Sequence, residues 1–450
     1  MTREFDIIIF GASGYSAIFI IEELAKTDKS KSVKWAVAGR NKAKLIEALK
    51  TASQNSGVDL QNIPLYIGDV NDAISLKEIC VKTNLLINCV GPYILYGEPV
   101  VKACIENGTD YLDICGETFV LEKTQLKYDK AAAEAKVFII GACGFDCVPS
   151  DMGVIFAENN FDGQLDRMEG YLEVMAKDRG NSPTINYTTF LSALMSMANY
   201  DKLEEVGNQL MPKKLPFNKS FLVEKRPFLF KIKGLGNLGI AKSGGDSGEV
   251  VGKDAWYLPF FAADKSAVLR SQYYMYEKEG KRPVQFRSYI KVESLLRAIL
   301  TIFIGGIVYL MAKFKLTRKL VELYPQIFTC GQVRVNGSPS RHDLSKTAFR
   351  WIMIAKGYSY SKNPQLSGRD LMLQMQHAPD AGIKICVSGP DAYKTTAICA
   401  TQVALTLHEE RNKLLTSGGV LTPAIVFRKT NLIQNLDDHG IKFEVLSVES

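Results

Sequence analysis

The chain has 450 residues, of which 46% are hydrophobic and 23% are charged, the proportions of an average globular protein. This composition excludes a mainly disordered chain, a collagen-like repeat and a polytopic membrane protein, and the length favours two or three domains. The net charge of +7 is concentrated in residues 201–320, which hold 22 basic and 11 acidic side chains and so favour contact with an anionic surface or ligand.

The first third of the chain alternates apolar runs with helical patterns. Six short apolar runs predict strands, at residues 6–10, 33–38, 65–67, 85–90, 111–114 and 137–140. Helical patterns lie between them, at residues 15–27, 41–50, 75–83, 98–107 and 120–135. This alternation predicts an α/β domain over residues 1–150, built on a Rossmann-type, doubly wound parallel sheet.

A glycine-rich turn follows the first strand and opens the first helix. The run Gly11-Ala12-Ser13-Gly14-Tyr15 places backbone N–H groups at the positive end of that helix. Dinucleotide-binding folds hold a pyrophosphate at this position. We therefore predict that Gly11, Ser13, Gly14 and Tyr15 contact a dinucleotide cofactor.

The end of the second strand distinguishes between the two nicotinamide cofactors. Sites that prefer NAD place Asp or Glu there to bind the ribose 2′-hydroxyl. Residues 29–46 contain no acid and include Arg40, whose guanidinium can bind a 2′-phosphate. The sequence therefore favours NADP over NAD.

Further cofactor contacts are expected in the loops after the third and fourth strands, because ligands bind at the carboxyl ends of parallel strands. Asp69 is predicted to accept a hydrogen bond from the adenine amino group. Asn88, Val90 and Gly91 are predicted to lie beside the nicotinamide.

Hydride transfer also needs a proton donor or acceptor close to the reacting carbon. Tyr93, Asp113 and Asp146 are the catalytic candidates, because each lies in a loop at the same edge of the sheet. No Ser-Tyr-x3-Lys arrangement accompanies them, and the first domain has no histidine. The acid or base of the reaction therefore stays open among these three.

The cysteines and histidines predict no metal site. The nine cysteines are scattered, and the four histidines all lie beyond residue 340. The N-terminus leads directly into the first strand without a signal-like segment. Together with the unclustered thiols, this predicts a cytosol-facing protein.

Residues 151–394 are predicted to form a second, α+β domain for substrate binding and homodimer contact. Strands are expected at 167–175, 285–292, 349–355 and 384–387, and helices at 150–158 and 184–198. Residues 207–260, rich in Gly, Pro and Lys, predict long loops with short strands. Residues 395–450, with helices at 395–411 and 432–438 and a strand at 442–448, are expected to pack back on the first domain.

An apolar segment at 295–314 interrupts the second domain. Its uncharged centre, 298–312, would form a helix of about 22 Å, shorter than the roughly 30 Å hydrocarbon core of a bilayer. A core helix, a monotopic membrane insert with a basic rim, and a full transmembrane span are all compatible with this pattern. The surrounding positive charge favours the insert, so we expect residues 295–319 to contact a lipid droplet or membrane. Nucleic acid is not an expected partner, because no recognition motif occurs.

Five motifs in this order, GASGY, AGR, NCVGPY, YLDICGE and GFDCVPSD, resemble the saccharopine dehydrogenase-like oxidoreductases. The resemblance covers residues 6–155, resumes at 388–390 and 418–423, and is strongest to the lipid-droplet-associated animal members. It implies an NADP-binding Rossmann domain, an α/β second domain and association with lipid droplets or membranes. For mycobacterial relatives it implies trans-acting enoyl reduction in glycolipid synthesis.

Two functional hypotheses follow. The first is an NADP-dependent oxidoreductase that acts on a small or lipid-like substrate at a lipid droplet or a cytosolic membrane face, in lipid or glycolipid metabolism, with the mitochondrion as an alternative location. The second is a non-catalytic lipid-droplet scaffold or cofactor sensor that retains the Rossmann domain. Ala17 and Ala424 support the second hypothesis, because the family usually has glycine at these two places, which we expect to face the ligand.

Overall fold

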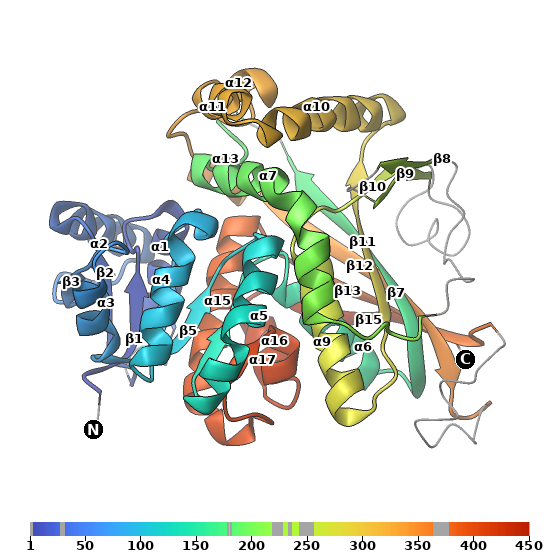
Figure 1. Ribbon diagram of the computed structural model, residues 1–450, viewed down its shortest axis with the longest axis horizontal. Helices are drawn as coiled ribbons and strands as arrows, with labels where there is room; N and C mark the ends of the chain where they lie inside the picture. Colours follow the sequence, from blue (N-terminus) through green and yellow to red (C-terminus); the bar gives the residue numbers. More distant parts are fainter. Residues whose placement is uncertain are drawn as a thin grey trace.

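The computed structural model describes residues 3–27, 32–177, 180, 182–217, 228–232, 236–242, 256–362 and 378–449. Lys29 and Lys31, from the stretch 29–46 that contains no acid, lie outside these residues, as do 218–227, 233–235 and 243–255 of the predicted loop region. Two β-sheets stand on opposite sides of the molecule, with helices between and around them (Figure 1).

The first sheet has seven strands in the order β14-β6-β5-β4-β1-β2-β3. They are β1 (Phe5–Phe10), β2 (Trp35–Gly39), β3 (Leu65–Ile67), β4 (Thr83–Asn88), β5 (Asp110–Asp113), β6 (Phe138–Ile140) and β14 (Gly419–Leu421). Every neighbouring pair is parallel, so the predicted Rossmann-type, doubly wound sheet is confirmed. The C-terminal part of the chain supplies β14, which extends the sheet beyond β6.

Helices cover both faces of this sheet, because alternate residues of a buried strand point to opposite sides. Ile7 and Ile9 of β1 belong to a core shared with α1 (Tyr15–Lys26), α2 (Lys42–Ser56) and α15 (Ala392–Glu409). Ile8 and Phe10 belong to the opposite core, shared with α3 (Ala73–Cys80), α4 (Tyr93–Glu106) and α5 (Thr118–Glu134). β1 lies between β4 and β2, where the strand order reverses, so the turn after β1 lies at the place where ligands bind in this fold.

The second sheet has eight strands in the order β15-β13-β12-β7-β11-β10-β9-β8. They are β7 (Gly163–Ala176), β8 (Phe228–Ile232), β9 (Gly236–Lys242), β10 (Trp256–Pro259), β11 (Gln285–Val292), β12 (Thr347–Ser359), β13 (Ala381–Pro390) and β15 (Lys442–Glu449). β7 and β11 are parallel, and the other neighbours are antiparallel. The predicted second α+β domain is confirmed, and residues 395–450 contribute one strand to each sheet.

The remaining described helices belong mainly to the second half of the chain. They are α6 (Val148–Asn159), α7 (Tyr187–Leu210), α9 (Asp264–Glu279), α10 (Leu295–Lys313), α11 (Lys315–Leu323), α12 (Pro325–Phe328), α13 (Arg341–Ser345), η2 (Arg411–Lys413), α16 (Pro423–Phe427) and α17 (Leu432–Asp438).

Several of the predicted boundaries are wrong; the helix expected at 98–107, for example, begins at Tyr93. The helix expected at 75–83 ends at Cys80, because Thr83 already belongs to β4. The loop expected from residue 207 begins later, because α7 continues to Leu210.

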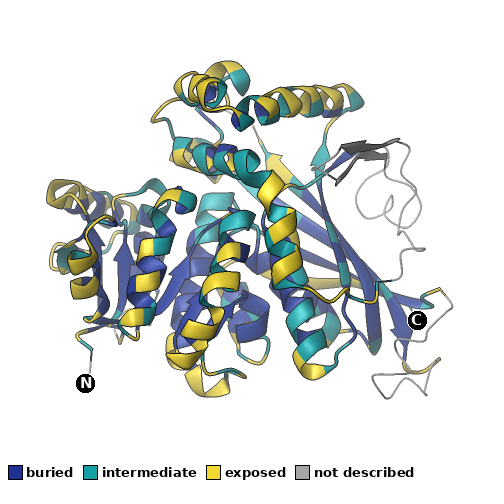
Figure 2. Ribbon diagram, viewed as in Figure 1, coloured by how far each residue is buried: buried dark blue, intermediate teal, exposed yellow. Residues whose placement is uncertain are grey.

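The helices α10, α11 and α12 form an outer layer beyond α7, and much of their surface is exposed (Figure 2). Among the described residues, α10 is the one helix long and apolar enough to cross a membrane, with a mean hydropathy of 2.1. Only 17% of its apolar stretch is buried, and Val308 and Ala312 pack towards α7. A core helix is therefore the wrong interpretation of this segment.

Candidate functional site

A cavity of about 1710 Å³ begins at the carboxyl ends of the first sheet and continues beneath α10. Its walls come from the β1–α1 turn, the loops after β2 and β4, and the helices α7, α9, α10 and α15. Pockets for one small ligand usually measure about 300–1,000 Å³. The cavity therefore has room for a cofactor and a second ligand together.

The β1–α1 turn has a backbone that requires glycine at Gly11. Its φ is +78°, and a Cβ there would lie 2.6 Å from Val90 Cγ2. The N–H groups of Gly11 and Ala12 donate to Ala38 O at 2.9 and 3.1 Å, which fixes the turn beside the end of β2. α1 then begins with no side-chain cap and no acid in its first turn. Its positive end stays unneutralised at the cavity wall, so these residues fit the pyrophosphate of a dinucleotide.

Seven of the nine predicted cofactor contacts line the cavity: Gly11, Ser13, Gly14, Tyr15, Arg40, Val90 and Gly91. Arg40 is exposed on the wall, where Asn41 and Lys44 lie with it. Two cations therefore meet at the place predicted for the 2′-phosphate.

The other two predicted contacts, Asp69 and Asn88, do not line the cavity. Asp69 Oδ1 accepts from the Asn71 N–H at 2.9 Å and closes a turn after β3. Asn88 is buried, where its Nδ2 donates to Tyr111 Oη at 3.1 Å and its Oδ1 accepts from the Val90 N–H at 3.0 Å. Asn88 thus shapes the loop that carries Val90, behind the cavity wall.

Tyr93 lines the cavity, but its hydroxyl is engaged within the protein. It donates to Asn88 O at 3.0 Å and accepts from the Ile114 N–H at 3.4 Å. Burial, and next the charge of Asp113, raise the pKa of Tyr93. Glu117 accepts from the Tyr93 N–H at 2.7 Å and so stabilises the first turn of α4.

Asp113 is buried behind the cavity, and both of its carboxylate oxygens have partners. Oδ1 accepts from the N–H groups of Cys115 and Ala142 at 3.0 and 2.8 Å. Oδ2 accepts from the Tyr111 hydroxyl at 2.8 Å. These bonds join the loops after β5 and β6, and burial raises the pKa of Asp113 in spite of them.

Asp146 lies on the cavity wall, beside a carboxyl group that sequence reasoning missed. Its Oδ2 accepts from the Ala263 N–H at 3.3 Å, and burial raises the pKa of Asp146. Asp264 begins α9 and is fully buried. Burial raises the pKa of Asp264 to about 7, and the charge of Asp146 adds to this, whereas Ser288 and Lys265 oppose it. Interacting carboxyl groups with raised pKa values are typical of acid–base sites.

The C-terminal helix α15 also contributes to the cavity wall. Thr396 Oγ1 accepts from the Phe145 N–H at 3.2 Å, next to Asp146. Tyr393 packs edge to face on Tyr15, with ring centroids 5.0 Å apart. Sequence reasoning missed both residues, because only the fold brings this distant helix to the β1–α1 turn.

Ala17 and Ala424, expected to face the ligand, lie in the core. Both are fully buried, and neither lines the cavity. Their methyl groups therefore leave the cavity unchanged, and that expectation is wrong. In the part of the chain that the structure describes, no group of three or more His, Cys, Asp or Glu side chains could hold a metal ion.

A doubly wound sheet whose central glycine turn opens into a cavity defines a dinucleotide-binding protein of the Rossmann type. Residues 7–140 match the family described as Saccharopine dehydrogenase NADP binding domain, which supports a nicotinamide cofactor. The chain belongs to the saccharopine dehydrogenase-like oxidoreductase family, as full-length relatives show.

Three such relatives cover nearly the whole chain. It is 33% identical to the saccharopine dehydrogenase-like oxidoreductase of Rattus norvegicus, over 99% of this chain and 98% of the relative. It is 33% identical to the "Lipid droplet localized protein" of Caenorhabditis elegans, over 98% of both chains. It is 30% identical to a protein of Arabidopsis thaliana named "Probable mitochondrial saccharopine dehydrogenase-like oxidoreductase", over 98% of this chain and 96% of the relative.

Proposed function

We propose that this chain is an NADP-dependent oxidoreductase that acts in lipid metabolism, on a lipid-like substrate, at the surface of a lipid droplet or a cytosolic membrane face. The observation that carries the proposal is the shared cavity. One end of it lies at the Gly11–Gly14 turn, and the other lies beneath α10, whose outer face is apolar and exposed. A substrate held there would reach both the cofactor and a lipid phase.

The outer faces of α10, α11 and α12 form a surface that we call the apolar platform. Its exposed large apolar side chains are Leu296, Ile299, Leu300, Phe303, Ile307, Leu310, Phe314, Leu316, Leu320, Leu323, Tyr324 and Ile327. Arg297, Lys315 and Lys319 are exposed among them. An apolar surface with a basic rim is suited to a membrane that carries anionic lipid headgroups.

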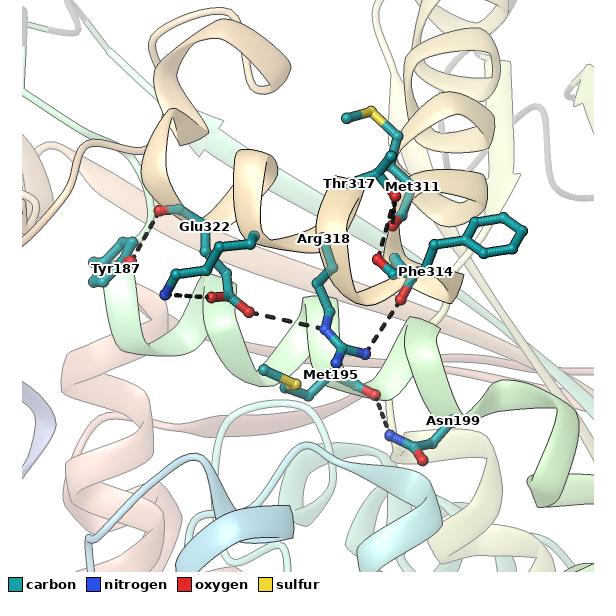
Figure 3. A network of polar contacts seen from close by, with 10 residues as sticks. Tyr187, Met195, Asn199, Met311, Phe314, Thr317, Arg318 and Glu322 are labelled. Atoms are coloured by element: carbon teal, nitrogen blue, oxygen red, sulfur yellow. Dashed lines mark hydrogen bonds and ion pairs between the residues drawn. The ribbon is translucent and has the colours of Figure 1, made fainter.

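Polar contacts at the corner between α10 and α11 hold the platform in one orientation (Figure 3). Arg318 Nη1 donates to Ala312 O at 3.3 Å, at the end of α10. The Tyr187 hydroxyl of α7 donates to Glu322 O at 2.9 Å and fixes the end of α11. A surface that is already ordered loses little conformational entropy on docking, which supports stable binding to lipid.

The names of the relatives bear on the location. The worm relative is named for the lipid droplet and the plant relative for the mitochondrion. The platform supports the droplet or a membrane face, because a droplet offers the apolar phase that these side chains match. We keep the mitochondrion as the alternative location.

The cavity residues also indicate how a proton is handled. A bound NADPH supplies a hydride, and reduction of a C=C or C=N bond consumes one proton as well. We assign that proton to the Asp146 carboxyl, because Asp146 lines the cavity and burial raises its pKa, whereas Asp113 lies behind the wall and the Tyr93 hydroxyl is bonded to Asn88 O. We propose Asp264, whose pKa of about 7 is raised in part by the charge of Asp146, as the group that returns a proton to Asp146.

Fluorescence titration of the purified protein with NADPH and NADH tests the cofactor. We expect both to bind, with NADPH the tighter. If neither nucleotide binds, the proposal of an oxidoreductase is refuted. A preference for NADH would refute the role of Arg40. Turnover is then sought with enoyl and imine compounds on lipid-like chains, with Asp146→Asn expected to bind NADPH normally but to lose activity.

A vesicle flotation experiment tests the platform. The variant Phe303→Glu/Leu310→Glu replaces two side chains that are 65% and 63% exposed, so its fold should survive. We expect it to stay in solution while the unchanged protein floats with phosphatidylcholine vesicles that contain phosphatidylserine. Ile74→Glu, at an apolar side chain of α3 that is 71% exposed, is the matched control and should float. A chain that stays off vesicles, and forms dimers that the platform variant breaks, would instead identify a homodimer interface.

The second candidate is a cofactor sensor or scaffold on the lipid droplet. The engaged polar atoms of Tyr93 and Asp113 favour it, because they leave few groups free for catalysis. A sensor predicts that NADPH changes the affinity for vesicles while no substrate is reduced. An oxidoreductase predicts NADPH oxidation that depends on Asp146.

A further inference from the structure

We infer that the part of the cavity beneath α10 binds the hydrocarbon chain of the substrate, and that Gly305 and Gly306 form the wall that admits it. This inference rests on the proposed function and names its substrate class. The substrate is a lipid with a long hydrocarbon chain, whose reactive group points towards the Gly11–Gly14 turn. The residues that would bind the hydrocarbon chain are separate from the Gly11–Gly14 turn, so hydrocarbon binding and cofactor binding can be tested separately.

α10 presents two different faces. Its cavity face consists of Thr301, Ile302, Gly305, Gly306 and Tyr309, which recur about every four residues and so form one stripe of the helix. The platform side chains of α10 recur with the same period on the opposite stripe. α10 therefore separates the cavity from the lipid phase by the thickness of one helix.

Two adjacent glycines in the middle of this helix need a reason. Each costs about 1 kcal/mol of helix stability relative to alanine. Glycines in helices usually allow close packing, yet a Cβ at Gly305 or Gly306 would meet nothing within 4 Å. Neither has a positive φ. The space beside them is therefore open, and it is part of the cavity.

Most of the cavity wall is apolar, although α7 also brings hydroxyl groups to it. α7 contributes Ala193, Met197 and Leu203 together with Ser192 and Ser196, and the second sheet contributes Leu258 and Ile290. Each methylene group buried in such a space improves affinity about fourfold. A hydrocarbon chain is the ligand that gains most from these walls.

Two tyrosines, Tyr200 and Tyr309, also line this cavity. The rings of Tyr200 and Tyr309 meet edge to face with centroids 6.5 Å apart, and they join α7 to α10. Burial raises the pKa of Tyr200, as expected beside an apolar space. The space therefore runs between two helices that the structure holds together, and its width is set by the residues on their facing sides.

Titration with cis-parinaric acid, a polyene fatty acid that fluoresces when bound in an apolar site, tests the inference. Gly305→Leu and Gly306→Leu place a side chain in the open space and also favour the helix, so the fold should survive. We expect each variant to bind the probe at least about tenfold more weakly and to bind NADPH as before. Gly305→Ala and Gly306→Ala, which add one methyl group, should change probe binding by about fourfold or less.

Displacement of the probe by octanoate, laurate and palmitate supplies a second readout. In the unchanged protein, affinity should rise along this series, and in Gly306→Leu it should stop rising at a shorter chain. A merely destabilised variant would weaken all three acids alike, and that result would overturn the inference. So would equal probe affinity in the leucine variants, no probe binding by the unchanged protein, or loss of binding only in Phe303→Glu/Leu310→Glu. If the unchanged protein bound the probe but not NADPH, the proposed function would be refuted, whereas the site for the hydrocarbon chain would still be supported.

Discussion

Tyr15, which follows the Gly11–Gly14 turn and begins α1, meets Tyr393 of the C-terminal helix α15 edge to face, with ring centroids 5.0 Å apart. The Tyr393 hydroxyl also accepts from the Asn186 N–H at 2.8 Å, at the start of α7. Tyr15 donates its own hydroxyl to Pro339 O at 2.8 Å. The turn that is predicted to hold the cofactor is thus supported by segments from the second half of the chain.

Two substitutions at Tyr393 separate these contacts. Tyr393→Phe keeps the ring and loses the hydroxyl that bonds Asn186 and Thr189, so it should cost about 1–2 kcal/mol of unfolding free energy and leave NADPH affinity nearly unchanged. Tyr393→Ala also removes the ring, and should cost about 3 kcal/mol and weaken NADPH binding several-fold. Urea unfolding and fluorescence titration measure the two effects. Unchanged NADPH affinity in Tyr393→Ala would show that α15 does not support the turn.

Gly11→Ala should damage both stability and cofactor binding. The substitution puts a Cβ 2.6 Å from Val90 Cγ2 at a φ of +78°, so the loop after β4 must move. Gly57, the C-cap of α2, has a φ of +74° but nothing within 4 Å of an added Cβ. Gly57→Ala therefore isolates the backbone strain, about 1–2 kcal/mol, and should leave NADPH binding intact. If Gly11→Ala and Gly57→Ala bound NADPH equally well, the close approach of Val90 to Gly11 would not be the cause of weakened binding.

The position of the Gly11–Gly14 turn and of Arg40 at the ends of neighbouring strands could be predicted from the sequence, because each directly follows a short apolar run, and both line the cavity. α9 could not, because its buried face includes Ser266, Ser271 and Gln272 and gives no apolar period. Asp264 was missed with it, since its raised pKa depends on burial and on Asp146 from a distant loop. Local sequence patterns predict helices and strands, whereas a site formed by the packing of distant segments can be found only from the three-dimensional fold.

Arg40→Ala should change which cofactor is preferred. Arg40 lies on the cavity wall and Lys42, in the first turn of α2, does not. We expect Arg40→Ala to weaken NADPH binding more than tenfold and to leave NADH binding unchanged, because only NADPH carries the 2′-phosphate. Lys42→Ala is the matched control and should alter neither affinity. If Arg40→Ala weakened the binding of NADPH and NADH equally, Arg40 would not be part of the site for the 2′-phosphate.

Asp264→Asn should change how stability depends on pH. The pKa of Asp264 rises from 3.8 to about 7 on folding, so between these values the folded protein holds a proton that the unfolded chain has lost. The contribution of this group to stability is therefore full below about pH 4, falls as the pH rises to 7, and is constant above that. The difference amounts to about 4 kcal/mol at most.

Urea unfolding at pH 5, 6, 7 and 8 measures this dependence as the difference between the unchanged protein and the variant. Burial also raises the pKa of Asp151, to about 6, so the stability of Asp264→Asn should still depend partly on pH. The stability of Asp151→Asn/Asp264→Asn should depend on pH even less. Asp162→Asn, at an exposed position, should reproduce the unchanged slope. A slope in Asp264→Asn equal to that of the unchanged protein would mean that Asp264 stays ionised in the fold, and it would then be unable to return a proton to Asp146.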